Sequence, residues 1–435
     1  MCAQGRFSSW KSRDGKRRVE VRRAVRRGGA WLFAGILLLA AAGAFHYLTA
    51  RSPGEVLILG LEVAPAGAVP AAVHGASAAG TGDIPGWRSR IVSVPSSGPK
   101  MNPAPLTRGF QDASSPALSY DGAWLLFPGR RGPGEPWALW EMHVDGSHRR
   151  RVTGGNGEPR DPSYLPDGKI VFSDRASRPE PAASGGARSL FTCDRDGSRM
   201  RRITFGAGDD SRARVLDDGR VLFERRGASR AGGDRPAQMI VNPDGTGLAR
   251  FDGGSIRPAM EEPAWGGADG AGVLPGENVV SVLRAAPRPR PRPLTSVVNE
   301  TNDSGRLLCL DVYQSRIARV AQLRPGAAET VRVYEAAAPG DAKLLGQAPV
   351  EPDGSFYLEV PVDTPLRLEL VGRAGRALAS CSAGVWVRPN ESRACIGCHD
   401  DPDLAPENRL PQAVRKPPVR LVAAAAPGAR AESRE

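Results

Sequence analysis

The chain has 435 residues, of which 52 are Gly and 39 are Pro, and only 6% are aromatic. This length allows two or three domains, and this composition predicts many turns and irregular connections. The formal net charge is +12, but residues 1–29 hold ten Lys and Arg against two acidic residues and so account for +8 of it. The rest of the chain is only slightly basic, which argues against nucleic acid as a partner.

An apolar run over residues 30–49 follows this basic tail. It predicts a transmembrane anchor, because about twenty uncharged residues can span a bilayer as one helix. Arginines ahead of the run would hold residues 1–29 in the cytoplasm. A cleavable signal peptide ending near Ala42 to Ala44 is the alternative. In both interpretations the bulk of the chain is exported. The transmembrane anchor predicts a single-pass protein of a bacterial inner membrane with its bulk in the periplasm.

Residues 50–110 are rich in Ala, Gly, Ser and Pro and contain little that could form a core. They predict a flexible spacer, with one short strand at 55–64.

Residues 111–325 repeat themselves with a period of roughly 50 residues. In one recurring unit an Asp-Gly pair precedes an apolar strand, and in a second unit an Asp-Gly pair joins two strands. The pairs are Asp121-Gly122, Asp167-Gly168 and Asp218-Gly219 in the first unit, and Asp145-Gly146, Asp196-Gly197 and Asp244-Gly245 in the second. Asp-Gly between apolar runs is a strong hairpin signal, because Gly accepts the positive φ of the turn. About four short strands per period predict the blades of a β-propeller of modest blade number. The residue pattern of the repeat resembles that of TolB-type propellers.

Degenerate copies of the repeat are expected within 257–282 and 305–313. Between them, residues 286–294 read APRPRPRPL and predict an extended, polyproline-like loop. Such a loop is expected to be a solvated insertion, and binding of an acidic partner by its arginines is the alternative.

Residues 326–388 predict a small antiparallel β-sandwich, because five segments alternate apolar and polar residues as half-buried strands do. The segments are 331–334, 343–345, 355–360, 366–370 and 384–387. Residues 389–418 follow as a separate segment, and residues 419–435 are expected to be a disordered tail. The predicted fold class is therefore all-β: a propeller, a sandwich and a C-terminal haem loop, preceded by one transmembrane helix.

Cys395, Cys398 and His399 form a Cys-x-x-Cys-His motif, the attachment signature of a c-type haem. Two thiols at this spacing can bond to the two vinyl groups of one porphyrin, and the adjacent imidazole can ligate the iron. The sequence therefore predicts one covalent haem c, held by these three residues with His399 as the metal ligand. A structural zinc site and a thioredoxin-like redox pair are the alternatives.

The region from 354 to 418 resembles the alpha subunit of hydrazine synthase and bacterial proteins similar to it. The runs that carry the resemblance are Gly354-Ser355-Phe356, Val385-Trp386-Val387-Arg388-Pro389, the motif at 395–399 and Asp400-Asp401-Pro402. It implies a propeller joined to a C-terminal segment with one haem, thioether bonds at Cys395 and Cys398, and His399 as an axial ligand. Catalytic members of the family place a tyrosine four residues after this histidine as an iron ligand. Asp403 stands there in this chain, so hydrazine synthesis is not assigned.

Two functional hypotheses follow from the haem. One is an electron-transfer protein that docks a redox partner on its propeller, and the other is small-molecule redox chemistry at an open iron position. A haem-free interaction module that binds zinc at the motif is the alternative to both. The residues considered for a sixth iron ligand are His74, His143, His148, Met142, Met200, Met239 and Met260. A disulfide between Cys309 and Cys381 is a further possibility that sequence alone leaves open.

Overall fold

The computed structural model describes residues 56–63, 88–95, 103–155, 157–175, 187–206, 208–227, 236–251, 277–315, 318–338, 341–397 and 409–421. All of them belong to one unit, Val56–Glu435. The predicted tail at 1–29 and the predicted anchor at 30–49 lie outside these residues. Among the described residues no helix has the length and apolar composition needed to cross a membrane. The predicted single-pass inner-membrane localisation, with the bulk in the periplasm, is therefore unsupported and is withdrawn.

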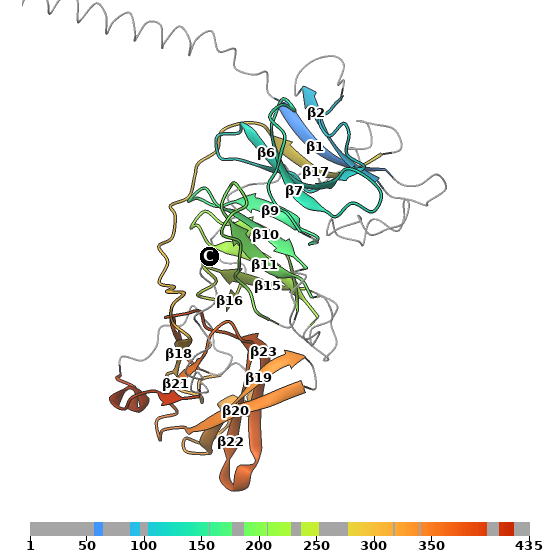
Figure 1. Cartoon of the computed structure of the whole chain (residues 1–435). Coiled ribbons are helices and arrows are strands. Elements are labelled where there is room, and N and C mark those ends of the chain that lie inside the picture. The colour runs from blue at the N-terminus through green and yellow to red at the C-terminus, as the bar shows by residue number, and fades with distance from the viewer. Residues whose placement is uncertain are drawn as a thin grey trace, which may run out of the picture. The chain divides into compact units, whose positions relative to one another are not determined.

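The all-β prediction is confirmed, and the first part of the chain forms antiparallel sheets of the propeller type (Figure 1). Blade one contains β1 (Val56–Val63), β2 (Arg88–Pro95), β3 (Ala104–Pro105) and β17 (Glu277–Arg284), in the order β17-β1-β2-β3. Blade two contains β4 (Asp112–Ala113), β5 (Ala117–Leu118), β6 (Trp124–Arg130), β7 (Ala138–His143) and β8 (Arg150–Arg151). Blade three contains β9 (Arg160–Tyr164), β10 (Ile170–Asp174), β11 (Ser189–Cys193) and β12 (Arg201–Arg202). Blade four contains β13 (Asp209–Val215), β14 (Val221–Arg226), β15 (Ala237–Val241) and β16 (Ala249–Arg250).

The predicted Asp-Gly pairs form the hairpin turns of blades two, three and four. In each turn the glycine has a positive φ, between 71° and 90°. The aspartate carboxylate accepts a hydrogen bond from the backbone N–H two residues later, as in the 2.8 Å bond from Ser147 to Asp145. The same bond recurs from Ser198 to Asp196 and from Thr246 to Asp244. This local chemistry explains why the repeat could be predicted from sequence.

Blade one corrects the prediction of a spacer over 50–110. The expected strand at 55–64 is present as β1, but β2 and β3 also lie in the range 50–110: β2 pairs with β1, and β3 pairs with β2. Ile91, Val92 and Val94 are buried, so residues 88–95 do supply core side chains within the Ala- and Gly-rich surroundings. The fourth strand, β17, follows blade four in the chain and pairs with β1. Residues 277–282, expected as a degenerate repeat, therefore complete blade one, and residues 257–276 lie outside the described residues.

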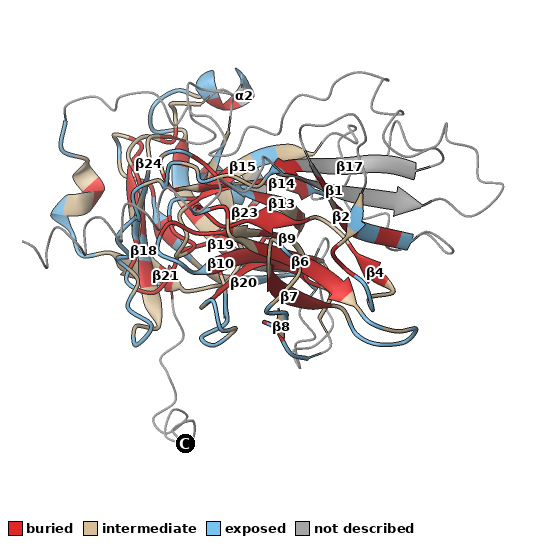
Figure 2. Cartoon of the chain, turned by 90° about the horizontal axis from the view of Figure 1, so that it is seen from above, coloured by how far each residue is buried: buried red, intermediate tan, exposed pale blue. Residues whose placement is uncertain are grey.

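Apolar side chains join each blade to the next. One buried cluster combines Ile91 and Leu283 of blade one with Leu125 and Phe127 of blade two. A second combines blades two and three, and a third combines blades three and four and also includes Trp386. The central strand β10 is buried along its whole length, as the burial colours in Figure 2 show. Such blades bury their faces against their neighbours rather than alone.

Residues 285–303, here called the strap, link β17 to the C-terminal domain and carry neither helix nor strand. Most of residues 286–294 are exposed, as expected for a solvated insertion, but Arg288 packs against blade two. The Arg288 guanidinium lies over the Tyr120 ring at 4.2 Å and donates a 2.8 Å hydrogen bond to the Leu118 carbonyl. A Cβ on Gly122 would lie 2.5 Å from the Ala286 backbone. The strap therefore packs closely against an Asp-Gly turn of blade two.

The C-terminal domain is the predicted sandwich of two sheets, with the orders β24-β18-β21-β25 and β20-β19-β22-β23. Its elements are β18 (Ser304–Cys309), α2 (Ala318–Ala321), β19 (Ala328–Ala338), β20 (Asp341–Pro349), β21 (Phe356–Pro361), β22 (Leu366–Gly372), η4 (Arg373–Gly375), β23 (Ala377–Val385), β24 (Ser392–Cys395), η5 (Gln412–Arg415) and β25 (Val419–Arg420).

Two predicted boundaries of this domain change. The sandwich begins at β18 rather than at 326, because β18 pairs with β21 and β24 instead of extending the propeller. Residues 389–418, which are predicted to hold the haem and are here called the haem segment, and the start of the predicted tail also belong to the sandwich. β24 pairs in parallel with β18, and β25 pairs in parallel with β21. Leu421, directly after β25, belongs to the sandwich core.

Candidate cofactor-binding site

Cys395 is the last residue of β24 and is half-buried. Ile396 and Gly397 follow it in a bend. Cys398 and His399 lie outside the described residues, as do Asp400, Asp401 and Asp403. The structure thus places one of the three predicted haem-binding residues and does not test the other two.

Backbone hydrogen bonds fix the position of Cys395. Strand β24 runs parallel to β18, with Cys395 in register with Cys309. Beyond the strand, the Leu310 N–H donates to the Cys395 carbonyl at 2.9 Å, and the Asp311 N–H donates to the Ile396 carbonyl at 3.1 Å. The first half of the motif is therefore an extension of a sheet, which is a rigid support for a covalent attachment point.

Gly397 occupies a position with no room for a side chain. It is buried, and a Cβ there would lie 1.9 Å from the Gln314 carbonyl oxygen and 2.9 Å from that of Asp311. Contacts under 3 Å would require the backbone of the 311–314 turn to move. Glycine between the two motif cysteines is thus explained by the close approach of this turn.

The chain returns to the same corner of the domain at residue 409. The Arg409 guanidinium donates to the Asp311 carboxylate at 2.9 Å, and the Gln412 N–H donates to the Asp353 carboxylate at 2.8 Å. Burial alone would raise the pKa of Asp353, but hydrogen bonds from Ser355 and from the Gln412 N–H hold it below its ordinary value. Asp311 and Asp353 therefore anchor the chain on the far side of the motif, while β18 anchors the near side.

A cavity of about 620 Å³ borders Cys395. Its volume falls within the range of about 300–1,000 Å³ that is usual for ligand and cofactor pockets. Most of its wall is apolar and comes from both sheets of the sandwich, with polar side chains at Arg250, Arg393, Glu391 and Asn242. The hairpin of β15 and β16 in blade four supplies another part of the wall, including Met239 and Leu248. The cavity is thus shared between the C-terminal domain and blade four.

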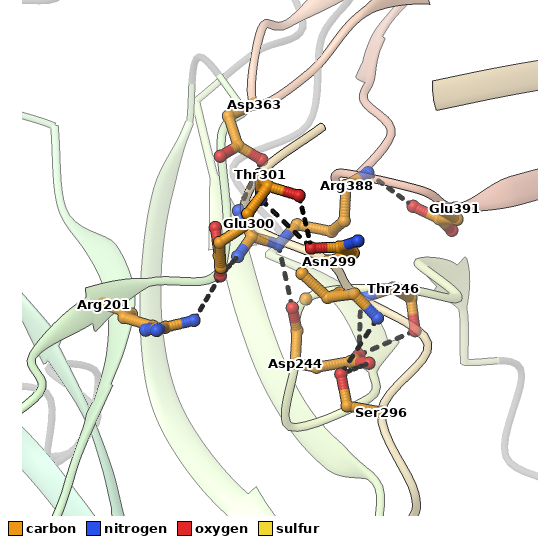
Figure 3. A network of polar contacts seen from close by, with 12 residues as sticks. Arg201, Asp244, Thr246, Ser296, Asn299, Glu300, Thr301, Asp363, Arg388 and Glu391 are labelled. Carbon is orange, nitrogen blue, oxygen red and sulfur yellow. Dashed lines mark hydrogen bonds and ion pairs between the residues drawn. The ribbon is translucent and has the colours of Figure 1, made fainter. Parts of the chain in front are cut away.

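The segment that leads into β24 is attached to the same hairpin. Trp386 is fully buried, lies against the Phe205 ring, and donates a 3.1 Å hydrogen bond from Nε1 to the Gly245 carbonyl. Arg388 is also buried; its Nε donates to the Asp244 carbonyl at 2.9 Å and its Nη2 pairs with Glu300 at 3.1 Å (Figure 3). These contacts hold the hairpin and the haem segment together on one side of the cavity.

Glu391 carries a buried carboxylate at this junction. It accepts hydrogen bonds from the Arg388 N–H at 2.7 Å and from the Gly247 N–H at 3.1 Å. Burial raises its pKa, and the two backbone hydrogen bonds oppose the rise without cancelling it. The pKa of Asp363, which pairs with Arg388, is also raised by burial despite that cation.

The candidates for a sixth iron ligand are widely separated. His143 and His148 lie beside Trp124 on blade two, and Met142 is buried inside the same blade. Met200 is 44% exposed. Met239 lines the cavity that Cys395 borders. His74 and Met260 lie outside the described residues. Met239 is the one residue of the β15–β16 hairpin considered from the sequence as a site residue, and the contribution of Leu248 and Arg250 to the cavity could not be predicted, because these residues come near Cys395 only in the folded chain.

The fold and the site together define a class: an all-β protein in which propeller blades are joined to a sandwich whose edge strand β24 ends at Cys395, the first residue of the Cys-x-x-Cys-His sequence. The comparisons specify the class further. Residues 306–400 match the family model of the hydrazine synthase alpha subunit middle domain. Hydrazine synthase subunit alpha from Kuenenia stuttgartiensis is 34% identical over 77 residues, which cover 16% of this chain and 10% of that protein.

The fold is similar to that of a solved protein over most of the chain. The solved hydrazine synthase of Kuenenia stuttgartiensis superposes with a TM-score of 0.69 at 15% identity, covering 84% of this chain and 72% of that one. A TolB-like protein from Agrobacterium tumefaciens reaches a TM-score of 0.31 at 23% identity, over 38% of this chain and 56% of that one. The predicted resemblance is confirmed: this chain is similar to the hydrazine synthase alpha subunit, in sequence over residues 306–400 and in fold over most of its length. Its sequence match spans only a tenth of the curated relative, and that protein's activity does not follow from the match.

Proposed function

We propose that this chain is a haem c protein that acts in electron transfer or haem redox chemistry. In this proposal Cys395 and Cys398 form the two thioether bonds, and His399 is an axial ligand of the iron. The observation that carries it is the cavity of about 620 Å³ beside Cys395, which offers an apolar space next to the predicted attachment point.

The described residues fit such a group in three respects. Leucine, valine and phenylalanine side chains from two sheets form an apolar wall that suits a flat macrocycle. Arg250 of blade four and Arg393 of β24, whose guanidinium donates to the Leu248 carbonyl, also line the cavity, and such cations suit the two propionate carboxylates of a haem. Cys395 is half-buried at the end of a strand, so its position is fixed while its thiol remains near the cavity.

A bound haem would supply one-electron redox chemistry at its iron. The chain's own residues would exclude water from the macrocycle, neutralise the propionates and fix the attachment point through β18. Hydrazine synthesis is not part of the proposal, because Asp403 stands where catalytic relatives have a tyrosine ligand.

We further propose that a redox partner docks on the propeller. Arg290 and Arg292 of the strap are exposed, which favours a partner with an acidic surface. Complex formation should then weaken as the salt concentration rises.

The test is to express the full chain with the maturation machinery of c-type cytochromes and to record its visible spectrum and intact mass. One added haem mass and a sharp reduced α-band support the proposal. Insensitivity of the band to CO indicates an electron carrier, and a CO-sensitive band indicates small-molecule chemistry. Absence of both haem mass and Soret band overturns it, and zinc bound to the motif would then support the interaction module.

A further inference from the structure

Two cysteines lie next to each other where strands β18 and β24 end. The strands run parallel, and Cys309 is in register with Cys395, each being the last residue of its strand. Neighbouring strands are about 4.8 Å apart, and a disulfide needs a Cα separation of about 4.4–6.8 Å. The backbone therefore holds these two residues at a distance that a disulfide can bridge.

Both side chains lie on the same face of this sheet. Side chains alternate between the two faces along a strand, so residues in register on parallel strands share a face. Cys309 belongs to the buried core cluster of the sandwich, and Cys395 packs against that cluster. Both residues also line the cavity described above. The two thiols are therefore directed toward the same space.

The two residues differ in exposure in a way that suits thiol–disulfide exchange. Cys309 is buried and Cys395 is half-buried, so an external disulfide oxidant would meet Cys395 first. The Cys395 thiolate attacks one sulfur of the oxidant and expels the other as a thiolate, which leaves a mixed disulfide. The Cys309 thiolate then attacks the Cys395 sulfur and expels the second oxidant thiolate. In total the two cysteines lose two protons and two electrons, and one oxidant disulfide becomes two thiols.

We propose that Cys309 and Cys395 form a reversible disulfide in the haem-free chain, and that reduction of this bond releases Cys395 for haem attachment. The oxidant is an external disulfide. The bond itself follows from the geometry of the two strands. Its consequence for haem attachment rests on the proposed function, because a sulfur held in a disulfide cannot form a thioether bond.

The alternative role for Cys309 is packing alone, since buried cysteines commonly act as small apolar residues. Cys381, the disulfide partner of Cys309 considered from the sequence, lies on β23 in the other sheet of the sandwich. A test must therefore identify which cysteines are joined, and a loss of free thiols alone is insufficient.

The experiment incubates the haem-free full chain in glutathione buffers of graded redox ratio, with and without urea. Alkylation traps the remaining thiols, non-reducing peptide mapping identifies the links, and circular dichroism checks the fold. We expect a peptide pair joined through Cys309 and Cys395, two hydrogens lighter than its reduced parts. We expect this link in the folded chain at an oxidised-to-reduced glutathione ratio at least about tenfold lower than in urea, because the fold holds the two thiols together.

Cys193→Ala and Cys309→Ala are matched variants, because both remove a buried cysteine. Cys193 is in register with Ile170 on the neighbouring strand. We expect C193A to form the link between Cys309 and Cys395 as the wild type does. Expressed with the maturation machinery, C309A should acquire haem like the wild type, because Cys309 forms no thioether bond.

The outcomes separate the two proposals. A link from Cys395 only to Cys398, a link from Cys309 only to Cys381, or two reduced thiols at every glutathione ratio overturns the pair and leaves the haem function standing. The expected link in a chain that never acquires haem mass leaves the pair standing and overturns the haem function. Haem mass on the matured chain, together with the link in the haem-free chain and its absence after haem loading, supports both.

Discussion

At the scale of single residues, the haem segment depends on how closely its backbone approaches a neighbouring turn. Gly397 lies directly against the turn at 311–314. Asp311 of the same turn accepts a hydrogen bond from Arg409, which follows the motif in the chain. The Cys-x-x-Cys-His sequence therefore requires not only its cysteines and histidine but also a residue without a side chain at position 397.

Replacing Gly397 by alanine should destabilise the C-terminal domain, because the new Cβ would meet backbone atoms rather than a movable side chain. We expect the free energy of unfolding to fall by about 1–3 kcal/mol, as for other overpacked sites. Gly154→Ala is the control, since nothing lies within 4 Å of a Cβ at that position. Urea denaturation of both variants measures the difference. Equal midpoints would show that the 311–314 turn can move to accommodate the new Cβ without loss of stability.

Cys193 provides a second test at this scale. It is buried on β11, and burial raises the pKa of its thiol to about 12. The thiolate is the reactive form, so at neutral pH this residue should resist alkylation in the folded protein. Peptide mapping after brief treatment with iodoacetamide should find Cys193 unmodified in buffer and modified in denaturant. Rapid modification in buffer would mean that blade three opens readily.

At the scale of elements, the connection from β23 to β24 joins the haem segment to blade four. Trp386 contributes an apolar ring to the core of blades three and four, and its indole N–H satisfies the carbonyl of the Asp-Gly turn between β15 and β16. The β15–β16 hairpin and the haem segment are thus parts of one packed unit.

Trp386→Phe should keep most of the packing and lose the hydrogen bond to Gly245, at a cost of about 1–2 kcal/mol in unfolding free energy. Trp386→Ala should cost about 3–5 kcal/mol, because it also leaves a cavity. Trp137→Phe, at a half-exposed position, should change stability by less than about 1 kcal/mol. Chemical denaturation followed by circular dichroism ranks the three, and a Trp386→Ala variant as stable as Trp137→Phe would contradict this account.

At the scale of the whole molecule, Glu391 makes the attachment between blade four and the C-terminal domain depend on pH. Its folded-state pKa is raised above the ordinary value of 4.5, so the folded protein retains this proton more strongly than the unfolded chain does. The stabilisation from Glu391 is therefore fully present below pH 4.5 and is lost as the pH rises through the higher, folded-state pKa. Other groups titrate in this range, so only the difference from a variant is informative.

Glu391→Gln removes this titration and keeps a carbonyl acceptor for only one of the Arg388 and Gly247 N–H groups, because these donate to different oxygens of the carboxylate. We expect the unfolding free energy of the wild type, relative to E391Q, to decrease as the pH rises from 4.5 toward neutrality. Thermal or urea unfolding of the two proteins across this range measures the change. A constant difference between them would mean that folding does not raise the pKa of Glu391.

Features with a local cause could be predicted from the sequence, and features made by distant residues could not. Asp145-Gly146 and its equivalents specify their turns within four residues, and alternation in 355–360 identifies a sandwich strand. The pairing of β17 with β1, the packing of Arg288 on Tyr120 and the cavity that Met239 and Cys395 both line join residues far apart in the chain. At the site, the motif identified Cys395, but only the folded arrangement connects it with a cavity.

The strand order of blade one has a consequence for how the protein is made. β1 comes early in synthesis, yet its partner β17 emerges only after blades two to four. Until then one edge of β1 offers unpaired backbone groups, and exposed edges of this kind invite association with other chains. Release of the nascent protein before residue 284 should thus yield an aggregation-prone product, and a chaperone that covers strand edges would be needed longest at the start of this chain.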